Sequence, residues 1–261
     1  PKPSSAASDV YKRQSQLRIA ELNVQAAERT DLTEVNAMHA VRLNFSKTGR
    51  AIYISHLDIN RMMTRAVRRA KLPMWYTEGF NPHPYLTFAL PLSLGQSSDC
   101  EYMDIRIEGD ITDEEIMNRL NAVLPEGVKI LSVSAPLYDA KEIEKALYFV
   151  KLIYKDAETA KLFAEEAQRL AEGEELLAEK KGKKGHRKVM KQINLIDFIY
   201  DMKFSTADNI VNLQCVLAAG NANNLNPTLL IETLEKQIGV EHEMVYIVRR
   251  KLITKDNKTF K

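Results

Sequence analysis

The spacing of apolar residues changes in an ordered way from residue 41 onward. Alternation over 41–54, interrupted by a turn-like Lys-Thr-Gly-Arg segment at 47–50, predicts a strand or a short hairpin. Helical spacing over 55–70 then predicts an amphipathic helix, which Ser55 can cap while Asp58 lies in its first turn. One face of this helix is apolar and the other is cationic.

The same two periods alternate through the rest of the chain. In the first half we expect further strands over 74–76, 85–90, 102–107 and 128–134, and a helix over 112–124. In the second half we expect strands over 147–154, 210–218 and 244–253, helices over 156–172 and 227–238, and strand-like ends around a basic insert within 175–204. Both halves therefore have the order β-α-β-β-α-β, and we predict an α+β fold of two tandem ferredoxin-like units.

Domain boundaries follow from this pattern. The first unit is expected over 41–140, and the second, with its basic insert, over 141–261. Residues 1–40 are expected to be a non-native or linker segment, because 3–14 resemble a translated adapter sequence and show neither alternation nor an amphipathic period. Met38 is the expected natural start.

Composition narrows the class of protein. The chain has 261 residues and a net charge of +2, and it has no apolar run of the roughly 18 residues that a membrane span requires. It also opens without a secretion leader, so we expect a cytoplasmic protein that does not contact a membrane. Cys100 and Cys215 are far apart in sequence and form no Cys-x-x-Cys pair, which argues against a cysteine-ligated cluster or zinc site. We expect reduced core thiols, no metal and no cofactor.

Basic residues form two groups. On the predicted first helix and just after it they are Arg61, Arg65, Arg68, Arg69 and Lys71, and in the insert they include Lys180, Lys181, Lys183, Lys184, Arg187 and Lys188. Because the net charge is small, such concentration favours a phosphate backbone as the ligand, and RNA is the leading class. The alternatives are a solvated helix face and a flexible hairpin tip.

A Gly-Phe-Asn-Pro-His-Pro segment at 79–84 predicts a stiff loop, since its two prolines fix the backbone. Asn81 and His83 can each form a hydrogen bond with a ligand there, and Trp75, Tyr76 and Phe80 can stack on bases. The alternative is a tight turn packed by these aromatic residues.

Two histidines are candidates for catalysis. If the first strand, the first helix and the proline loop converge, His56 and His83 can act as an acid/base or metal pair, with Asp58, Asp104 or Glu101 nearby. Both can equally be structural hydrogen-bonding residues. Ser55, His56 and Asp58 cannot form a catalytic triad within one helical turn, and no glycine-rich nucleotide motif occurs.

Several long segments carry a family resemblance. They are FSKTGRAIYISHLD, RAVRRAKLP, GFNPHP and FALPLSLGQSSDCEYMDI, with weaker likeness in the late NLNP and RRKL segments. Together they resemble the uncharacterised bacterial family of radical SAM-linked proteins, a domain of unknown function encoded beside, or fused to, a radical S-adenosylmethionine protein with a cobalamin-binding-type domain. The resemblance implies a shared pathway with such an enzyme, and the family has no established reaction.

We therefore expect an RNA-binding protein that recognises a tRNA or rRNA substrate for a radical SAM enzyme and has no catalytic activity of its own. One alternative is a histidine-dependent endoribonuclease or RNA-modifying enzyme that uses His56 or His83. Another is a protein-interaction scaffold for the radical SAM protein.

Overall fold

The computed structural model describes residues 38–184, 187–220 and 223–261, and for residues 180–184 and 187–191 it describes the backbone alone. The predictions for residues 1–37 lie outside the described residues. The strands are β1 (His39–Lys47), β2 (Leu86–Phe88), β3 (Ser97–Ile107), β4 (Val128–Ser134), β5 (Ile143–Ile153), β6 (Leu177–Lys184), β7 (Arg187–Asn194), β8 (Ile199–Ala207), β9 (Ile210–Ala218) and β10 (Met244–Thr254). The α-helices of the described part are α2 (His56–Arg69), α3 (Asp113–Asn121), α4 (Ala157–Ala171) and α5 (Pro227–Ile238). Short 3-10 helices are η1 (Gly49–Tyr53), η2 (Ala140–Glu142) and η3 (Ile196–Phe198).

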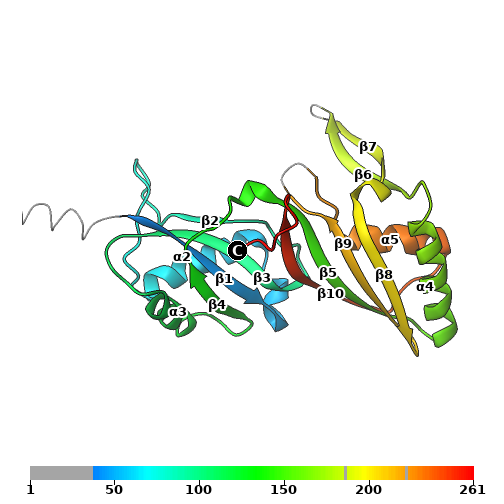
Figure 1. The fold of residues 1–261 in the computed structure, drawn as a ribbon, viewed down its shortest axis with the longest axis horizontal. Coiled ribbons are helices and arrows are strands. Elements are labelled where there is room, and N and C mark those ends of the chain that lie inside the picture. The colour runs from blue at the N-terminus through cyan, green and yellow to red at the C-terminus, as the bar shows by residue number, and fades with distance from the viewer. Residues whose placement is uncertain (1–37, 185–186, 221–222) are drawn as a thin grey trace, which may run out of the picture.

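One large mixed sheet runs through the molecule (Figure 1). It has 8 strands in the order β4-β1-β3-β10-β5-β9-β8, with β2 paired to β3, while β6 and β7 form a separate hairpin. Strands β3 and β10 are parallel over Val248–Ser97 and Arg249–Ser98, and the other neighbours are antiparallel. The mixed α+β class predicted from the sequence is confirmed.

The two halves of the sheet have matching strand orders. In the first half the order is β4-β1-β3-β2, and in the second it is β10-β5-β9-β8. Because β10 pairs with both β3 and β5, the halves share one continuous sheet. The division at residue 140 stays a prediction.

The buried apolar residues form two core clusters, and the second also includes Ala89, Leu90, Cys100 and Tyr102 of the first half. In the first half α2 and α3 pack on the sheet around residues such as Met63, Met103 and Ile116. In the second half α4 and α5 pack on the sheet, and Phe163 and Leu234 are fully buried there. Figure 1 shows these two helices together beside β8 and β9. Cys100 and Cys215 are free and buried, as predicted for core thiols.

Two predicted strands are wrong. Residues 51–54, expected to be extended, lie largely in η1, because Ala51 and Ile54 close successive backbone turns onto the carbonyls of Thr48 and Ala51. Residues 74–76 make only isolated bridges, one of them to Pro84, which has no backbone N–H to extend a ladder.

Strand β3 begins at Ser97, earlier than expected, whereas β4, β9 and α5 have the predicted bounds. No helix in the described part of the chain is long and apolar enough to span a membrane.

Candidate nucleic-acid interface

Helix α2 places the first group of arginines. Ser55 caps it: its Oγ accepts a hydrogen bond from the Asp58 backbone N–H (3.2 Å) and donates one to the Asp58 carboxylate (2.7 Å). Its apolar stripe, which includes Met63 and Val67, is buried against the first half of the sheet. The arginines at helical spacing therefore face outward, as the sequence predicted.

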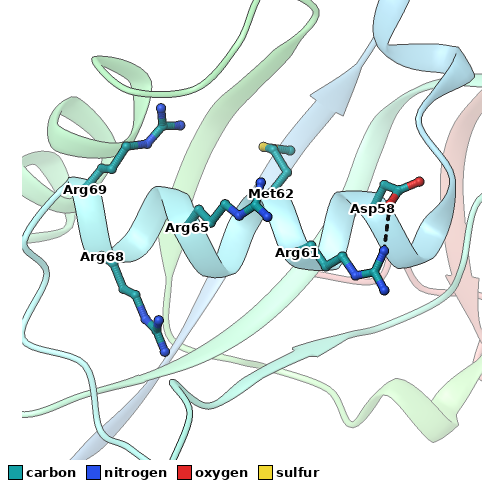
Figure 2. A pocket seen from close by; sticks show the side chains of 6 residues that line it. All are labelled: Asp58, Arg61, Met62, Arg65, Arg68 and Arg69. Atoms are coloured by element: carbon teal, nitrogen blue, oxygen red, sulfur yellow. Dashed lines mark hydrogen bonds and ion pairs between the residues drawn. The ribbon is translucent and has the colours of Figure 1, made fainter.

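Four of these arginines line one groove of ≈ 580 Å³ (Figure 2). The lining residues are Asp58, Arg61, Met62, Arg65, Arg68 and Arg69, and we call this surface the arginine groove. Figure 2 shows Arg61 and Arg68 pointing to one side of α2 and Arg69 to the other, with Arg65 between them. Four guanidinium groups against one carboxylate leave three net positive charges.

The four guanidinium groups differ in their contacts. Arg61 contacts the Asp58 carboxylate at 3.3 Å, and Arg69 donates to the Val123 carbonyl oxygen at 2.9 Å. The Arg68 guanidinium lies 6.0 Å from the centre of the Tyr76 ring. Arg65 is exposed and, among the described residues, has no hydrogen bond, ion pair or aromatic ring as a partner. Arg65 is therefore the strongest candidate for a ligand contact.

Asp58 reduces the positive charge of the arginine groove near the N-terminal end of α2. The hydrogen bond from Ser55, and secondarily Arg61, lower the pKa of its exposed carboxyl group below the ordinary value. The carboxylate is ionised at neutral pH and competes with a bound anion only near Arg61.

The proline loop, 79–84, and the residues that flank it are held together by backbone hydrogen bonds, and we call residues 75–85 the arm. The backbone N–H of Thr77 donates to the His83 carbonyl (2.9 Å), and Tyr85 donates to Trp75 (3.1 Å). His83 Nδ1 lies 3.0 Å from both Thr77 Oγ1 and the Asn81 carbonyl oxygen. A carbonyl oxygen only accepts, so the contact with Asn81 is a hydrogen bond only in a form of the ring that carries a proton on Nδ1.

The stacking residues proposed for this arm differ in exposure. Phe80 is fully exposed. Trp75 packs edge-on against Tyr85, with Arg106 over both rings, and so serves packing rather than a ligand.

His56 lies elsewhere, at the start of α2. Its ring packs edge-on against Phe88 with centroids 5.2 Å apart, and it lines a water-sized pocket with Lys47 and Glu101. Within the described residues His56 and His83 share neither a hydrogen bond nor a pocket, and their action as a pair stays a prediction. The same residues contain no group of three or more His, Cys, Asp or Glu side chains able to hold a metal.

The other residues predicted to contact RNA lie outside the arginine groove. Lys71 follows α2 in a left-handed conformation (φ 52°), and Asn81 is exposed in the proline loop; neither lines the arginine groove. The second basic group, Lys180, Lys181, Lys183, Lys184, Arg187 and Lys188, lies on the β6–β7 hairpin, and these side chains lie outside the described part. Figure 1 shows this hairpin projecting from the second half.

Sequence reasoning missed a buried charged cluster between the halves. Arg249 of β10 donates three hydrogen bonds of 2.6–3.0 Å to Glu101 of β3, and donates to the carbonyls of Leu90 and Pro91. Nearby, Lys47 Nζ donates to the carbonyls of Ile52 (3.3 Å) and Ile54 (2.8 Å).

Burial lowers the pKa of Lys47; Glu101 opposes that effect and Arg249 adds to it. The burial of Lys47 could have been predicted from the sequence, because Lys47 occupies the next position in the alternation of buried residues that includes Leu43 and Phe45. No such signal marked Arg249 as the partner of Glu101.

This cluster unites segments that are far apart in sequence. Lys47 and His56 come from FSKTGRAIYISHLD, Glu101 from FALPLSLGQSSDCEYMDI and Arg249 from RRKL. Three of the segments that carry the family resemblance thus meet near the contact between β3 and β10.

Comparison with known proteins gives the family and little else. A crystal structure of a Cbf5-Nop10-Gar1 complex is similar over 81% of this chain and 48% of that chain, with 9% identity and a TM-score of 0.43, so the chain spans about half the length of that protein. A crystal structure of an unknown protein from Galdieria sulphuraria is similar over 82% of this chain and 99% of that chain, with 12% identity and a TM-score of 0.23. Both TM-scores are too low to bear on function, and no curated protein matches the chain.

Residues 40–227, more than half of the chain, match the family of uncharacterized proteins conserved in bacteria (DUF2344). The chain belongs to that family.

Proposed function

We propose that this protein binds structured RNA, either tRNA or rRNA, through the arginine groove and holds it as the substrate of a radical SAM enzyme. The observation that carries the proposal is the groove itself, with three net positive charges along one exposed helix face. Guanidinium groups pair with phosphate oxygens through two parallel hydrogen bonds, and clustered cations release counterions when they bind a phosphate backbone.

Overall charge supports the same ligand. The chain has a net charge of only +2, so the arginine groove and the Lys-rich hairpin segment concentrate positive charge that is balanced elsewhere. Each of these two basic groups attracts a polyanion more strongly than the rest of the surface does.

The radical SAM partner rests on the family resemblance of the N-terminal segments alone. In this proposal the enzyme supplies the chemistry, and the present chain, without catalytic activity or a cofactor of its own, supplies substrate recognition. We place this activity in the cytoplasm, where tRNA and rRNA are modified.

We further infer that the two halves are ferredoxin-like units in tandem, joined edge to edge. The matching orders β4-β1-β3-β2 and β10-β5-β9-β8, each with two helices on one face, support this reading.

The test is RNA retention at two salt concentrations. Full-length protein and an Arg65→Glu variant are incubated with total cellular RNA in low and moderate salt, and the retained RNA is sequenced. The matched control is Arg169→Glu on α4, an exposed arginine that pairs with Glu166 of its own helix. We expect selective, salt-sensitive retention that Arg65→Glu weakens and Arg169→Glu preserves. The slope of log affinity against log salt should fall by about one for each phosphate that Arg65 neutralises in the wild-type complex.

Other outcomes of this experiment favour one of the two alternative functions. Absence of retention at low salt overturns RNA binding and favours the protein scaffold. Cleavage of the retained RNA by the wild type, but not by His56→Ala or His83→Ala, establishes instead the histidine-dependent endoribonuclease.

A further inference from the structure

The second half of the sheet carries helices on one face. Along β5, Tyr148, Val150 and Leu152 point into the core that α4 and α5 cover. Phe149 and Lys151 alternate with them and are exposed on the opposite face. We call this opposite face the open sheet face.

Two adjacent rows of side chains cross the open sheet face. The first row, over β8, β9, β5 and β10, is Lys203, Gln214, Phe149 and Val248. The second row, over the same strands, is Ser205, Asn212, Lys151 and Tyr246. All eight residues line one hollow of ≈ 470 Å³, within the size range of small-ligand sites.

The hollow presents two aromatic rings to solvent. Phe149 is 40% exposed and Tyr246 is 48% exposed, on neighbouring strands and in neighbouring rows. The Arg250 guanidinium lies 5.6 Å from the centre of the Phe149 ring. Rings held in this way on a rigid sheet can stack on planar ligands at little cost in conformational entropy.

The polar residues around the rings are cationic or neutral. Lys151 and Lys203 provide two positive charges, and no residue that lines the hollow is acidic. Lys203 Nζ lies 3.5 Å from a carboxylate oxygen of Asp201 in an exposed pair. Asn212 and Gln214 are exposed between the rings and Lys203, and their amides can both donate to and accept from base edges.

We propose that the open sheet face binds a single-stranded segment of RNA, with bases stacked on Phe149 and Tyr246 and phosphates near Lys151 and Lys203. This inference rests on the proposed RNA-binding function and names the unpaired part of the substrate as what this half of the protein recognises. Only unpaired bases can expose their faces to a protein ring, because bases in a helix are stacked on each other. The two lysines favour this polyanion over an apolar peptide.

The test uses a short fluorescent RNA of mixed sequence without secondary structure, and fluorescence anisotropy with the full-length protein. Phe149→Ala is expected to weaken binding by about tenfold to a hundredfold, the range seen when one base-stacking ring is removed. Phe149→Leu keeps apolar area without the aromatic face and should weaken binding almost as much, whereas Phe149→Tyr should retain it. The matched control is Tyr53→Ala, which removes an exposed ring from η1 in the first half.

The charged positions give a second readout that does not depend on the ring. Lys151→Glu should weaken binding and flatten its salt dependence, while Lys161→Glu on α4, an equally simple charge reversal, should do neither. Thermal melting of each variant shows whether it is folded.

The outcomes separate this inference from the proposed function. If wild-type protein retains structured RNA but ignores the oligonucleotide, or if Phe149→Ala and Phe149→Leu bind it like wild type, the open sheet face is not the site and the arginine groove stands. If wild-type protein binds neither RNA, both proposals fail. Loss of oligonucleotide binding in Phe149→Ala and its recovery in Phe149→Tyr establish the site.

Discussion

Cys100 and Cys215 are single residues whose ionisation reports on folding. Burial, with a smaller contribution from Glu101, raises the pKa of Cys100 to about 12. Burial, with a smaller contribution from Asp201, raises the pKa of Cys215 to about 12. The folded protein therefore keeps both thiols protonated at a pH where an unfolded chain, with an ordinary value near 9.0, ionises them.

This difference predicts a loss of stability at alkaline pH. A group whose pKa is higher in the folded state than in the unfolded state makes its full contribution to stability below its unfolded-state pKa. That contribution falls as the pH rises toward the folded-state pKa. We expect the free energy of unfolding, measured by urea denaturation, to decline above pH 9, with each thiol contributing up to about 1.4 kcal/mol per pH unit.

Cys215→Ala should remove its share of that slope. The comparison is made between pH 9 and 10, because Tyr102, whose pKa burial raises to about 12, adds a similar effect above pH 10 in every variant. An unchanged slope in Cys215→Ala would contradict the assignment.

At the scale of elements, Gly127 fixes how η1 meets β4. Its backbone is left-handed (φ 87°), and its carbonyl accepts a hydrogen bond of 2.7 Å from the Thr48 N–H. A Cβ at this position would lie 2.4 Å from the Thr48 carbonyl oxygen, which is backbone and cannot move aside easily.

Gly127→Ala is accordingly expected to destabilise the fold by more than backbone conformation alone requires. The control is Gly239→Ala, at the C-terminal end of α5, which has a similar φ of 82° but no atom within 4 Å of an added Cβ. The control should cost about 1–2 kcal/mol of unfolding free energy, and Gly127→Ala clearly more. Equal costs in urea denaturation would show that the steric contact with Thr48 is relieved without penalty.

Elements were predictable where local chemistry decides them. Helix α2 has a serine cap, an acidic first turn and one apolar stripe, so both its existence and its outward arginines followed from residue spacing. The prediction for 51–54 failed because specific hydrogen bonds shape that segment: it forms backbone turns, and the Lys47 side chain donates to the carbonyls of Ile52 and Ile54. Periodicity carries no record of such bonds. The open sheet face was not predicted because its two rows of side chains form across four strands.

At the scale of the whole molecule, a short parallel contact and a buried ion pair lie where the two halves meet. Two residue pairs connect β3 to β10, and Glu101 and Arg249 lie beside them at 4% and 1% exposure. These two residues are 148 positions apart, so no sequence pattern connects them. A buried pair contributes little net stability over apolar residues, but removal of one partner leaves a charge without compensation.

Glu101→Ala is therefore expected to cost about 3–5 kcal/mol of unfolding free energy. The double variant Glu101→Leu with Arg249→Met should recover most of that loss. Asp99→Asn is the matched control, because the exposed Asp99–Arg250 pair bridges the same two strands and should contribute no more than about 1 kcal/mol. Urea denaturation measures all three, and equal losses in Glu101→Ala and Asp99→Asn would show that water reaches the inner pair.

The position of β10 also governs how the chain is made. Of the strands in the large sheet, β10 is the last to leave the ribosome, yet it lies between β3 and β5. Until it is synthesised, the adjoining edges of β3 and β5 have unpaired N–H and C=O groups, which are templates for pairing with other chains. Closure of the sheet thus follows the synthesis of all its other strands, and the nascent protein is most exposed to aggregation just before β10 docks.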